Sequence, residues 1–333
     1  MTNAGRVDQP AAADQGARAC PLCGARGAAP CLRAERRTRA GEPYQVLACP
    51  GCGVRYTHPL PPAAELAALY TEEFYGGCPG GRLSWESLRR ALHRVVLRHR
   101  RRALLGRRPG RVLDVGCGDG DFLAYLQGFG WAGYGTEFSE AACALARSRG
   151  VVVQEGSLRG AGFPEGFFDV VTMWHVLEHL PDPAAELAEA RRVLRADGLL
   201  ILEVPNLGCL TFRLCRGWWW PLDVPRHLLH FTPETLGRLL DAGGFEVLRR
   251  QDFHAADAAL SFMSFVNRLG LIGRLQGDHY FVTDYRRASA AKQASFLLLA
   301  PLIGLFSVPY SALATLLSRN GETVTITAGK VGP

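Results

Sequence analysis

Apolar and polar positions follow two alternating patterns from residue 111 onward. Short apolar runs typical of buried strands lie at 111–116, 131–138, 151–156, 167–174, 198–205 and 245–253. Apolar residues spaced three and four apart, as in helices, lie between them at 120–130, 139–150, 183–194 and 234–244. Regular alternation of apolar strands with helices predicts a parallel sheet covered by helices on both faces. The alternating segment 322–331 predicts a closing strand.

The segments before this region follow other patterns. Residues 1–17 are polar and alanine-rich without an apolar run, so they predict a disordered lead and no export signal. Residues 59–110 predict a connector with one short helix and then a longer helix with arginines on one face. We expect that helix to be solvated on its arginine face and to cover the next domain. The alternative is a phosphate- or membrane-facing patch.

Two Cys-x-x-Cys-Gly sequences, CPLCG and CPGCG, lie ahead of that connector. Tight turns of this kind direct two thiolates toward one centre, and two such turns form a tetrahedral site for Zn²⁺. Residues 18–58 therefore predict a zinc ribbon, with YQVLAC as a strand leading into the second turn. Protein fills all four positions, which indicates a structural metal, and a redox pair is the alternative. The predicted ligands are Cys20, Cys23, Cys49 and Cys52.

Residues 254–320 form an insertion before the closing strand. Its segment 293–318 carries no charge and is long enough to span a membrane, but Pro301 and Pro309 interrupt it. The closing strand must also return to the side of the other strands. A helical hairpin that dips into one leaflet through residues 259–317 meets both constraints. The flanking basic residues, which would meet anionic headgroups, are Arg286, Arg287, Lys292 and Arg319. A buried dimer interface or a helical cap over the active site is equally compatible.

Composition changes this picture only slightly. The net charge of +7 comes almost entirely from arginine, and the abundance of arginine, alanine and glycine is typical of a GC-rich genome. We therefore do not expect nucleic acid as a partner. Ten cysteines without an export signal indicate a reducing cytoplasm and favour metal over disulfides.

The first strand of the alternating region ends in the glycine-rich turn DVGCGDG, residues 114–120. Glycines let the backbone approach a ligand, and the start of the following helix favours anions. The third glycine comes one residue too early for a dinucleotide fingerprint, so the turn alone is a weak signal. Glu137 ends the second strand, where a carboxylate could take both ribose hydroxyls.

In this context VLDVGCGDGDFL resembles motif I of the class I S-adenosylmethionine-dependent methyltransferases. The similarity continues through YGTEFS, FPEGFFDVVTMWHVLEHLPDP, LRADGLLILEVPN and LLDAGGFEV. The resemblance implies a Rossmann-like seven-stranded sheet with an antiparallel last strand, formed by residues 111–253 and 321–331. It also implies that Asp114 and the first glycines surround the methionine end of the cofactor, that Glu137 holds the ribose and that residues 156–157 flank the adenine. The full expected cofactor set is Asp114, Gly116, Cys117, Gly118, Gly120, Glu137, Phe138, Gly156, Ser157 and Trp174.

The fourth strand is followed by HVLEHLPDP, and the fifth by a long aromatic segment that we expect to form a substrate lid or wall. These segments supply the candidate catalytic residues His175, Glu178, His179 and His227. Three interpretations of these residues remain open. They have a structural role in shaping the loop, or one of the histidines takes the proton of the acceptor, or they bind a divalent metal. Ubiquinone-pathway and small-RNA methyltransferases hold a metal with a similar stretch, but His175 replaces their glutamate. A metal such as Mg²⁺ is therefore the least expected.

The sequence thus predicts a cytoplasmic S-adenosylmethionine-dependent methyltransferase with an N-terminal zinc ribbon. We expect it to act on a hydroxyl of a small or lipid-linked intermediate such as a glycan, polyketide or quinone precursor. If the insertion enters a leaflet, the enzyme is peripheral on the inner face of the plasma membrane. The alternatives are an RNA methyltransferase and a non-catalytic zinc-ribbon scaffold. The sequence predicts no oligomeric state.

Overall fold

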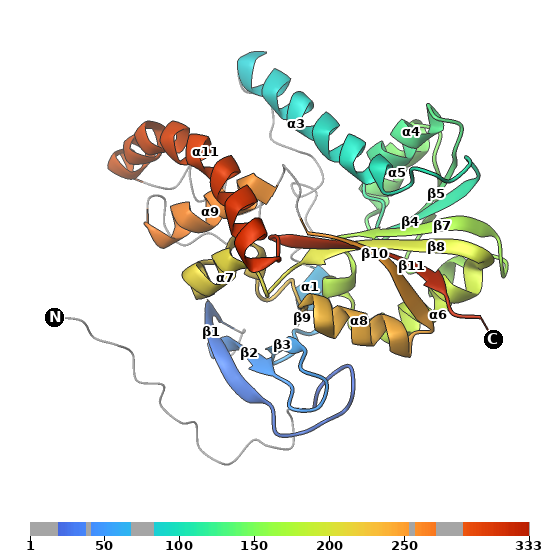
Figure 1. Ribbon diagram of the computed structural model, residues 1–333, viewed down its shortest axis with the longest axis horizontal. Coiled ribbons are helices and arrows are strands. Elements are labelled where there is room, and N and C mark those ends of the chain that lie inside the picture. Colours follow the sequence, from blue (N-terminus) through green and yellow to red (C-terminus); the bar gives the residue numbers. More distant parts are fainter. Residues whose placement is uncertain (1–18, 38–40, 68–82, 253–256, 271–288, 333) are drawn as a thin grey trace.

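The structure is a computed structural model that describes residues 19–37, 41–67, 83–252, 257–270 and 289–332 (Figure 1). The predicted lead, residues 1–17, lies outside these ranges, as do Arg286, Arg287 and the end of the predicted first hairpin arm.

A seven-stranded sheet in the order β10-β11-β8-β7-β4-β5-β6 forms the centre of the larger part of the molecule. Strands β4 to β8 are parallel to one another, and β11 lies antiparallel between β8 and β10. This topology confirms the predicted Rossmann-like sheet with an antiparallel last strand. The strands are β4 Arg111–Val115, β5 Ala132–Glu137, β6 Val152–Glu155, β7 Phe168–Trp174, β8 Leu194–Pro205, β10 Phe245–Gln251 and β11 Thr323–Lys330.

Helices cover both faces of this sheet, as the alternating pattern predicts (Figure 1). One core joins the sheet to α6 and α8, and a second joins it to α3, α4 and α5. Successive residues of β7 enter opposite cores, Val170 in one and Val171 in the other, because strand side chains alternate between faces. The helices are α3 Leu83–Arg102, α4 Asp121–Gln127, α5 Glu140–Ser148, α6 Pro183–Val193 and α8 Pro233–Ala242.

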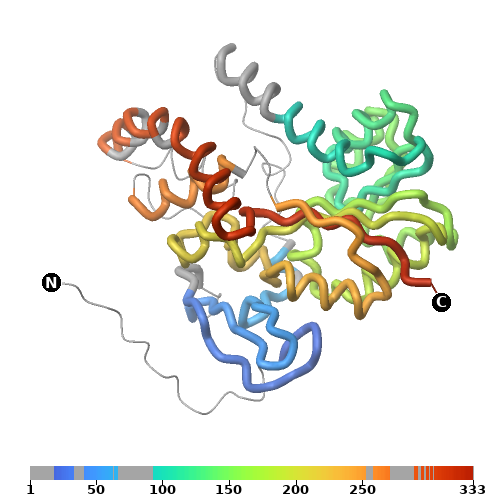
Figure 2. Tube along the Cα trace, viewed as in Figure 1, coloured from blue at the N-terminus to red at the C-terminus, as the bar shows by residue number. Residues whose placement is uncertain are grey.

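The N-terminal ribbon is an antiparallel sheet of β1 Ala29–Arg37, β2 Pro43–Ala48 and β3 Arg55–His58, followed by the short helix α1 Ala63–Ala67. Its fourth strand comes from far along the chain. Strand β9 Leu229–His230, within the predicted lid, pairs with β3. Figure 2 shows this blue ribbon lying against the yellow and gold chain between α7 and α8. The ribbon therefore shares one sheet with the lid.

The insertion contributes two helices, α9 Asp257–Arg268 and α11 Ala290–Ser318, which pack against each other and against α7 Leu210–Cys215. The expectation that Pro301 and Pro309 interrupt the second helix is wrong, because α11 is continuous through both. Each proline removes one backbone hydrogen bond, but both lie on the exposed side, where water can satisfy the freed carbonyls. Among the described residues, no helix has the length and apolar character required to cross a membrane.

Candidate functional site

The glycine-rich turn after β4 lies at the carboxyl edge of the sheet. Gly116 has a φ of 67°, and a Cβ there would lie 2.8 Å from Cγ2 of Val176, so a larger residue would both strain the backbone and collide. The amide of Gly118 donates to Oε2 of Glu137 at 3.0 Å. The turn and the end of β5 are therefore held together by the carboxylate that the sequence assigns to the cofactor ribose.

Asp114, at the start of this turn, is buried and accepts a 2.5 Å hydrogen bond from the hydroxyl of Thr172 on β7. Burial raises its pKa to about 6, although the Thr172 hydrogen bond and the charge of Arg100 oppose that shift. The structure brings the other predicted cofactor residues to the same edge. These are Cys117, Gly120, Phe138, Gly156, Ser157 and Trp174.

Arg100 is a site residue that the sequence does not identify. It comes from α3, and its guanidinium carbon lies 5.1 Å from the ring centroid of Trp174. Burial lowers its pKa, while the charges of Asp114 and Glu203 raise it. Its Nε atom is buried and has no hydrogen-bond partner among the described residues. Periodicity alone could not have separated it from the many other arginines of this helix.

His175 directly follows β7 and has a left-handed backbone, with a φ of 57°, which is strained for a histidine. Its Nδ1 lies 3.4 Å from Oε1 of Glu178, and its Nε2 lies 3.2 Å from Oε1 of Glu203. Burial lowers its pKa, but the attraction of the two nearby carboxylates outweighs burial and raises the pKa to about 10. His175 is therefore an imidazolium at neutral pH, a form that cannot accept another proton.

Glu178, in the short turn η3 Leu177–His179, is 1% exposed. Neither of its carboxylate oxygens has a hydrogen-bond partner among the described residues, because His175 lies at ion-pair distance without hydrogen-bond alignment. One oxygen of Glu178 and one ring nitrogen each of His179 and His227 lie within 4.8 Å of one another. The structure thus brings three of the four predicted catalytic side chains to one point, with His175 behind Glu178.

Backbone carbonyls fix the ring orientation of both histidines. Nδ1 of His179 lies 3.0 Å from the Arg226 carbonyl oxygen, and Nδ1 of His227 lies 2.8 Å from that of Pro221. Because a carbonyl only accepts, Nδ1 of each ring carries a proton, so that the neutral form of either ring has its lone pair on Nε2. Nε2 of His227 lies 4.0 Å from Oε1 of Glu178. Burial and then the charges of nearby histidines lower the pKa of His227 well below its usual value, so His227 is neutral.

The predicted lid forms the wall behind these histidines. Its elements are α7, η4 Arg216–Trp218, η5 Trp220–Leu222 and β9, and most of its side chains are buried. On β9, His230 contacts the Thr57 hydroxyl at 3.2 Å, and burial lowers its pKa to about 3. The next helix, α8, begins with Thr232 as its cap and Pro233 in its first turn.

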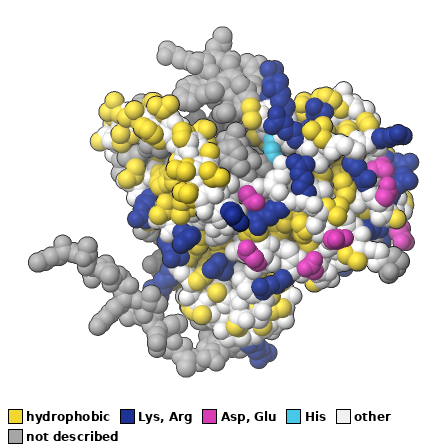
Figure 3. All heavy atoms as spheres, viewed as in Figure 1, with side chains coloured by type: hydrophobic (Ala, Val, Ile, Leu, Met, Phe, Trp, Pro, Cys, Tyr) yellow, Lys and Arg dark blue, Asp and Glu magenta, His cyan; other side chains and the backbone are white. Residues whose placement is uncertain are grey.

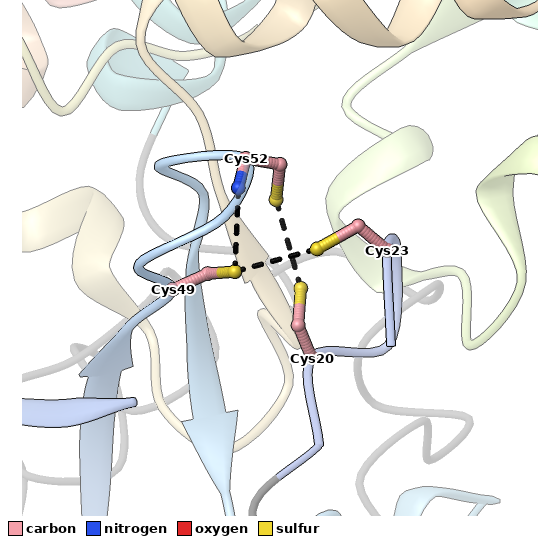
Figure 4. A group of neighbouring side chains, drawn as sticks. All are labelled: Cys20, Cys23, Cys49 and Cys52. Atoms are coloured by element: carbon pink, nitrogen blue, oxygen red, sulfur yellow. Dashed lines mark hydrogen bonds between the residues drawn. The ribbon is translucent and has the colours of Figure 1, made fainter. Parts of the chain in front are cut away.

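The four cysteines of the ribbon converge from two turns (Figure 4). Sγ of Cys20 lies 3.6 Å from Sγ of Cys52, and Sγ of Cys23 lies 3.5 Å from Sγ of Cys49. Sulfurs around a tetrahedral Zn²⁺ with Zn–S bonds of about 2.3 Å lie about 3.8 Å apart, so the spacing is compatible with zinc. Burial raises the pKa of Cys20 and of Cys52. Burial acts on Cys49 in the same direction, but the Cys52 amide and the Cys23 thiol outweigh it and lower the pKa to about 7, which favours a thiolate at that one position.

Comparisons with known proteins agree with this geometry. A family model described as a methyltransferase domain matches residues 85–250. A probable S-adenosylmethionine-dependent methyltransferase of Mycolicibacterium smegmatis is 34% identical over 158 residues, which are 46% of this chain and 58% of that protein. A ubiquinone biosynthesis O-methyltransferase of Thiobacillus denitrificans is 33% identical over 111 residues, 31% of this chain and 48% of the relative. The chain spans about half the length of the curated relatives it matches.

Among solved structures, an S-adenosylmethionine-dependent methyltransferase from Thermotoga maritima, described as a possible histamine N-methyltransferase, is similar at 21% identity. The similarity covers 75% of this chain and 96% of that one, with a TM-score of 0.44.

The strand order, the glycine turn after β4 and the acidic end of β5 together define a class I methyltransferase domain. With the family match over residues 85–250, the chain belongs to the S-adenosylmethionine-dependent methyltransferases.

Proposed function

We propose that this protein transfers a methyl group from S-adenosylmethionine to a hydroxyl group of a small or lipid-linked biosynthetic intermediate. The observation that carries this proposal is the convergence of Glu178, His179 and His227 next to the cofactor edge. Three proton-accepting groups meet there, and the buried carboxylate has no hydrogen-bond donor among the described residues. A substrate hydroxyl supplies the donor that such a site requires.

The chain's own residues fit the cofactor. The space that a Cβ would occupy at Gly118 is open, which leaves room for a ligand at the turn, and the Glu137 carboxylate at the end of β5 is positioned for ribose hydroxyls. Arg100 offers a partly unsatisfied guanidinium beside Asp114, which suits the cofactor carboxylate. When bound, S-adenosylmethionine supplies a methyl group on a cationic sulfonium and is left as S-adenosylhomocysteine.

As the acceptor oxygen gains the methyl group, it must lose its hydroxyl proton to a base. We assign that role to His227, because its Nε2 carries the lone pair of the neutral ring. Burial lowers its pKa, which keeps the ring neutral but also weakens it as a base, so it depends on a nearby anion. Glu178, 4.0 Å away, would favour the imidazolium that forms. His175 is already protonated and holds Glu178 by charge, so its role is positioning.

The same convergence favours a second candidate, a divalent cation that binds the acceptor. Two ring nitrogens and one carboxylate suit a transition metal better than Mg²⁺. We further propose Zn²⁺ as a structural metal in the ribbon, held by the four cysteines of Figure 4.

The test uses methyl-labelled S-adenosylmethionine and fractionated cell extract. We expect label in the lipid or small-molecule fraction. His227→Gln and Glu178→Gln should lower kcat by about 10²- to 10⁴-fold without weakening cofactor binding in calorimetry. The matched control is Glu246→Gln, at an exposed position on β10.

Other outcomes distinguish the alternatives. Label in RNA would favour an RNA methyltransferase, and failure to bind the cofactor would favour a scaffold. Binding without transfer to any fraction would overturn the proposal. A second metal equivalent, lost with chelator and in His227→Gln, would support the cation candidate in place of direct proton transfer.

A further inference from the structure

The helix pair α9–α11 buries polar side chains and exposes apolar ones, which is the reverse of a helix pair in the core of a water-soluble protein. Its buried side chains are mostly small, and the polar ones are Ser261 and Ser264 at 0% exposure, Asn267 at 1%, Ser311 at 2% and Ser307 at 4%. The buried apolar side chains among the described residues of the pair are Ala258, Val266 and Ala314. Its large apolar side chains point outward, and those more than half exposed are Leu298, Leu302, Leu305, Phe306, Val308, Leu313, Leu316 and Leu317.

These outward residues form a continuous ridge on α11. At about 100° per residue they span about half of the helix circumference along more than half of its length. Figure 3 shows hydrophobic side chains gathered on this end of the molecule, with basic side chains beside them. An amphipathic helix in water places its apolar side inward, whereas helices in contact with lipid pack through small residues and face outward with apolar ones.

The packing of the buried side explains why the helices remain folded. The Ser264 hydroxyl accepts from the Trp220 amide at 2.9 Å and donates to the Leu260 carbonyl. The Ser261 hydroxyl donates to Glu322 at 2.7 Å. These polar bonds, with the buried Val266 and with Phe265 packed against the lid, fix the helix pair to the lid and to Glu322, and the outward apolar side chains take no part in this packing. The apolar ridge is therefore free to contact something else.

We infer that the ridge docks the protein on an anionic membrane surface. The described charged side chains on α7, α9 and α11 are Arg213 and Arg268, both basic and exposed, and exposed Arg319 follows α11. This charge complements anionic headgroups, while the uncharged ridge enters the leaflet beside them. The ridge is a convex cylinder, which adaptable lipid chains can surround, whereas a protein partner would need a matching groove.

The surface lies close to the acceptor side of the site. Ser264 of α9 bonds to η5, and the Pro221 carbonyl of η5 orients His227. Resting on the proposed function, this contact implies a lipid-linked acceptor that is presented from the bilayer. Membrane docking itself requires no turnover, so its test is independent of activity.

The experiment is sedimentation of the full chain with vesicles of phosphatidylcholine alone or with added phosphatidylglycerol. We expect binding to the anionic vesicles that weakens with salt. Leu305→Glu with Leu316→Glu should lower the partition coefficient at least about tenfold. Arg213→Gln with Arg319→Gln should lower it about fivefold per arginine on anionic vesicles only. The control is Leu105→Glu, since Leu105 is 61% exposed but lies away from the ridge.

The ridge lies outside the cofactor edge, so its substitutions should leave cofactor binding unchanged. Binding of S-adenosylmethionine in calorimetry therefore serves as the test that each variant is folded. Wild-type protein that does not sediment with anionic vesicles would overturn the inference. So would a double glutamate variant that binds as well as the wild type. A dimer in light scattering that the double glutamate variant dissociates, without lipid binding by the wild type, would instead assign the ridge to a second copy of the chain.

Discussion

Glu322, at the start of β11, is the buried carboxylate at which the lid, the insertion and the sheet meet. It is 3% exposed. Its Oε1 accepts from the hydroxyls of Ser261, at 2.7 Å, and Thr211. Its Oε2 accepts from Nε1 of Trp219 at 2.8 Å and from the Cys209 thiol at 3.6 Å. Four donors from two separate parts of the chain, residues 209–219 and α9, therefore depend on one side chain beside the sheet.

Two substitutions of Glu322 should lower the free energy of unfolding by different amounts, with glutamine costing less than leucine. Glu322→Gln keeps one carbonyl oxygen for Trp219, and its amide can donate to hydroxyls, which rotate to accept. We expect a loss of about 1–2 kcal/mol in the free energy of unfolding. Glu322→Leu leaves the Trp219 N–H and two hydroxyls buried without their acceptor. At about 1–3 kcal/mol for each orphaned group, partly relieved by rearrangement, we expect a loss of about 3–5 kcal/mol.

The measurement is urea denaturation followed by tryptophan fluorescence, with the exposed Glu246→Gln and Glu246→Leu as matched controls. The controls should change stability by less than about 0.5 kcal/mol. If Glu322→Leu is as stable as Glu322→Gln, or if both match their controls, the carboxylate does not hold these three parts together.

Two further predictions concern charge and metal. The raised pKa of His175, about 10, means that its protonation stabilises the fold fully below about pH 6.5 and that this contribution is lost as pH rises through 10. Because the side chain is 36% exposed, we expect a loss of about 1–2 kcal/mol between pH 7 and 10, absent in His175→Gln. If the free energy of unfolding falls equally between pH 7 and 10 in the wild type and in His175→Gln, this prediction is contradicted. Treatment with a chelator should release one zinc equivalent, and Cys49→Ser should lower the bound zinc by the same amount. Both changes should speed amide hydrogen exchange at Thr57 and Leu229, where the ribbon pairs with the lid. Unchanged exchange would show that the metal does not stabilise this pairing.

The parallel part of the sheet could be predicted because its signals are local. Each of these strands contains a short apolar run, and right-handed connections set its neighbours. The place of the closing strand as the seventh and its antiparallel direction follow only from the resemblance to the methyltransferase family. The start of α8 was equally predictable, since Thr232 and Pro233 provide a cap and a first turn whatever packs around them.

The parts that escaped prediction depend on contacts between distant segments. Nothing in the two residues of β9 indicates a strand, and they become one only by pairing with β3. Arg100 is one of many arginines in α3 and differs only in facing Trp174. The two prolines of α11 do not interrupt the helix, because they lie on its exposed side, where water can replace the missing hydrogen bonds. Which side of the helix is exposed depends on how the helix packs, and the sequence pattern does not show it.

The pairing of β3 with β9 attaches the ribbon to the methyltransferase domain next to the proposed acceptor site. The Thr57 hydroxyl donates to the His227 carbonyl at 2.6 Å, and the Thr57 amide donates to the Leu228 carbonyl at 2.9 Å. The Leu228 amide in turn donates to the Glu178 carbonyl at 2.8 Å. The ribbon therefore bonds to the lid backbone at His227 and Leu228, and Leu228 links that backbone to Glu178, which follows the end of β7. Because a displacement of about 1 Å can cost a large factor in rate, we expect the ribbon to affect the proposed reaction through the position of these residues rather than through metal chemistry.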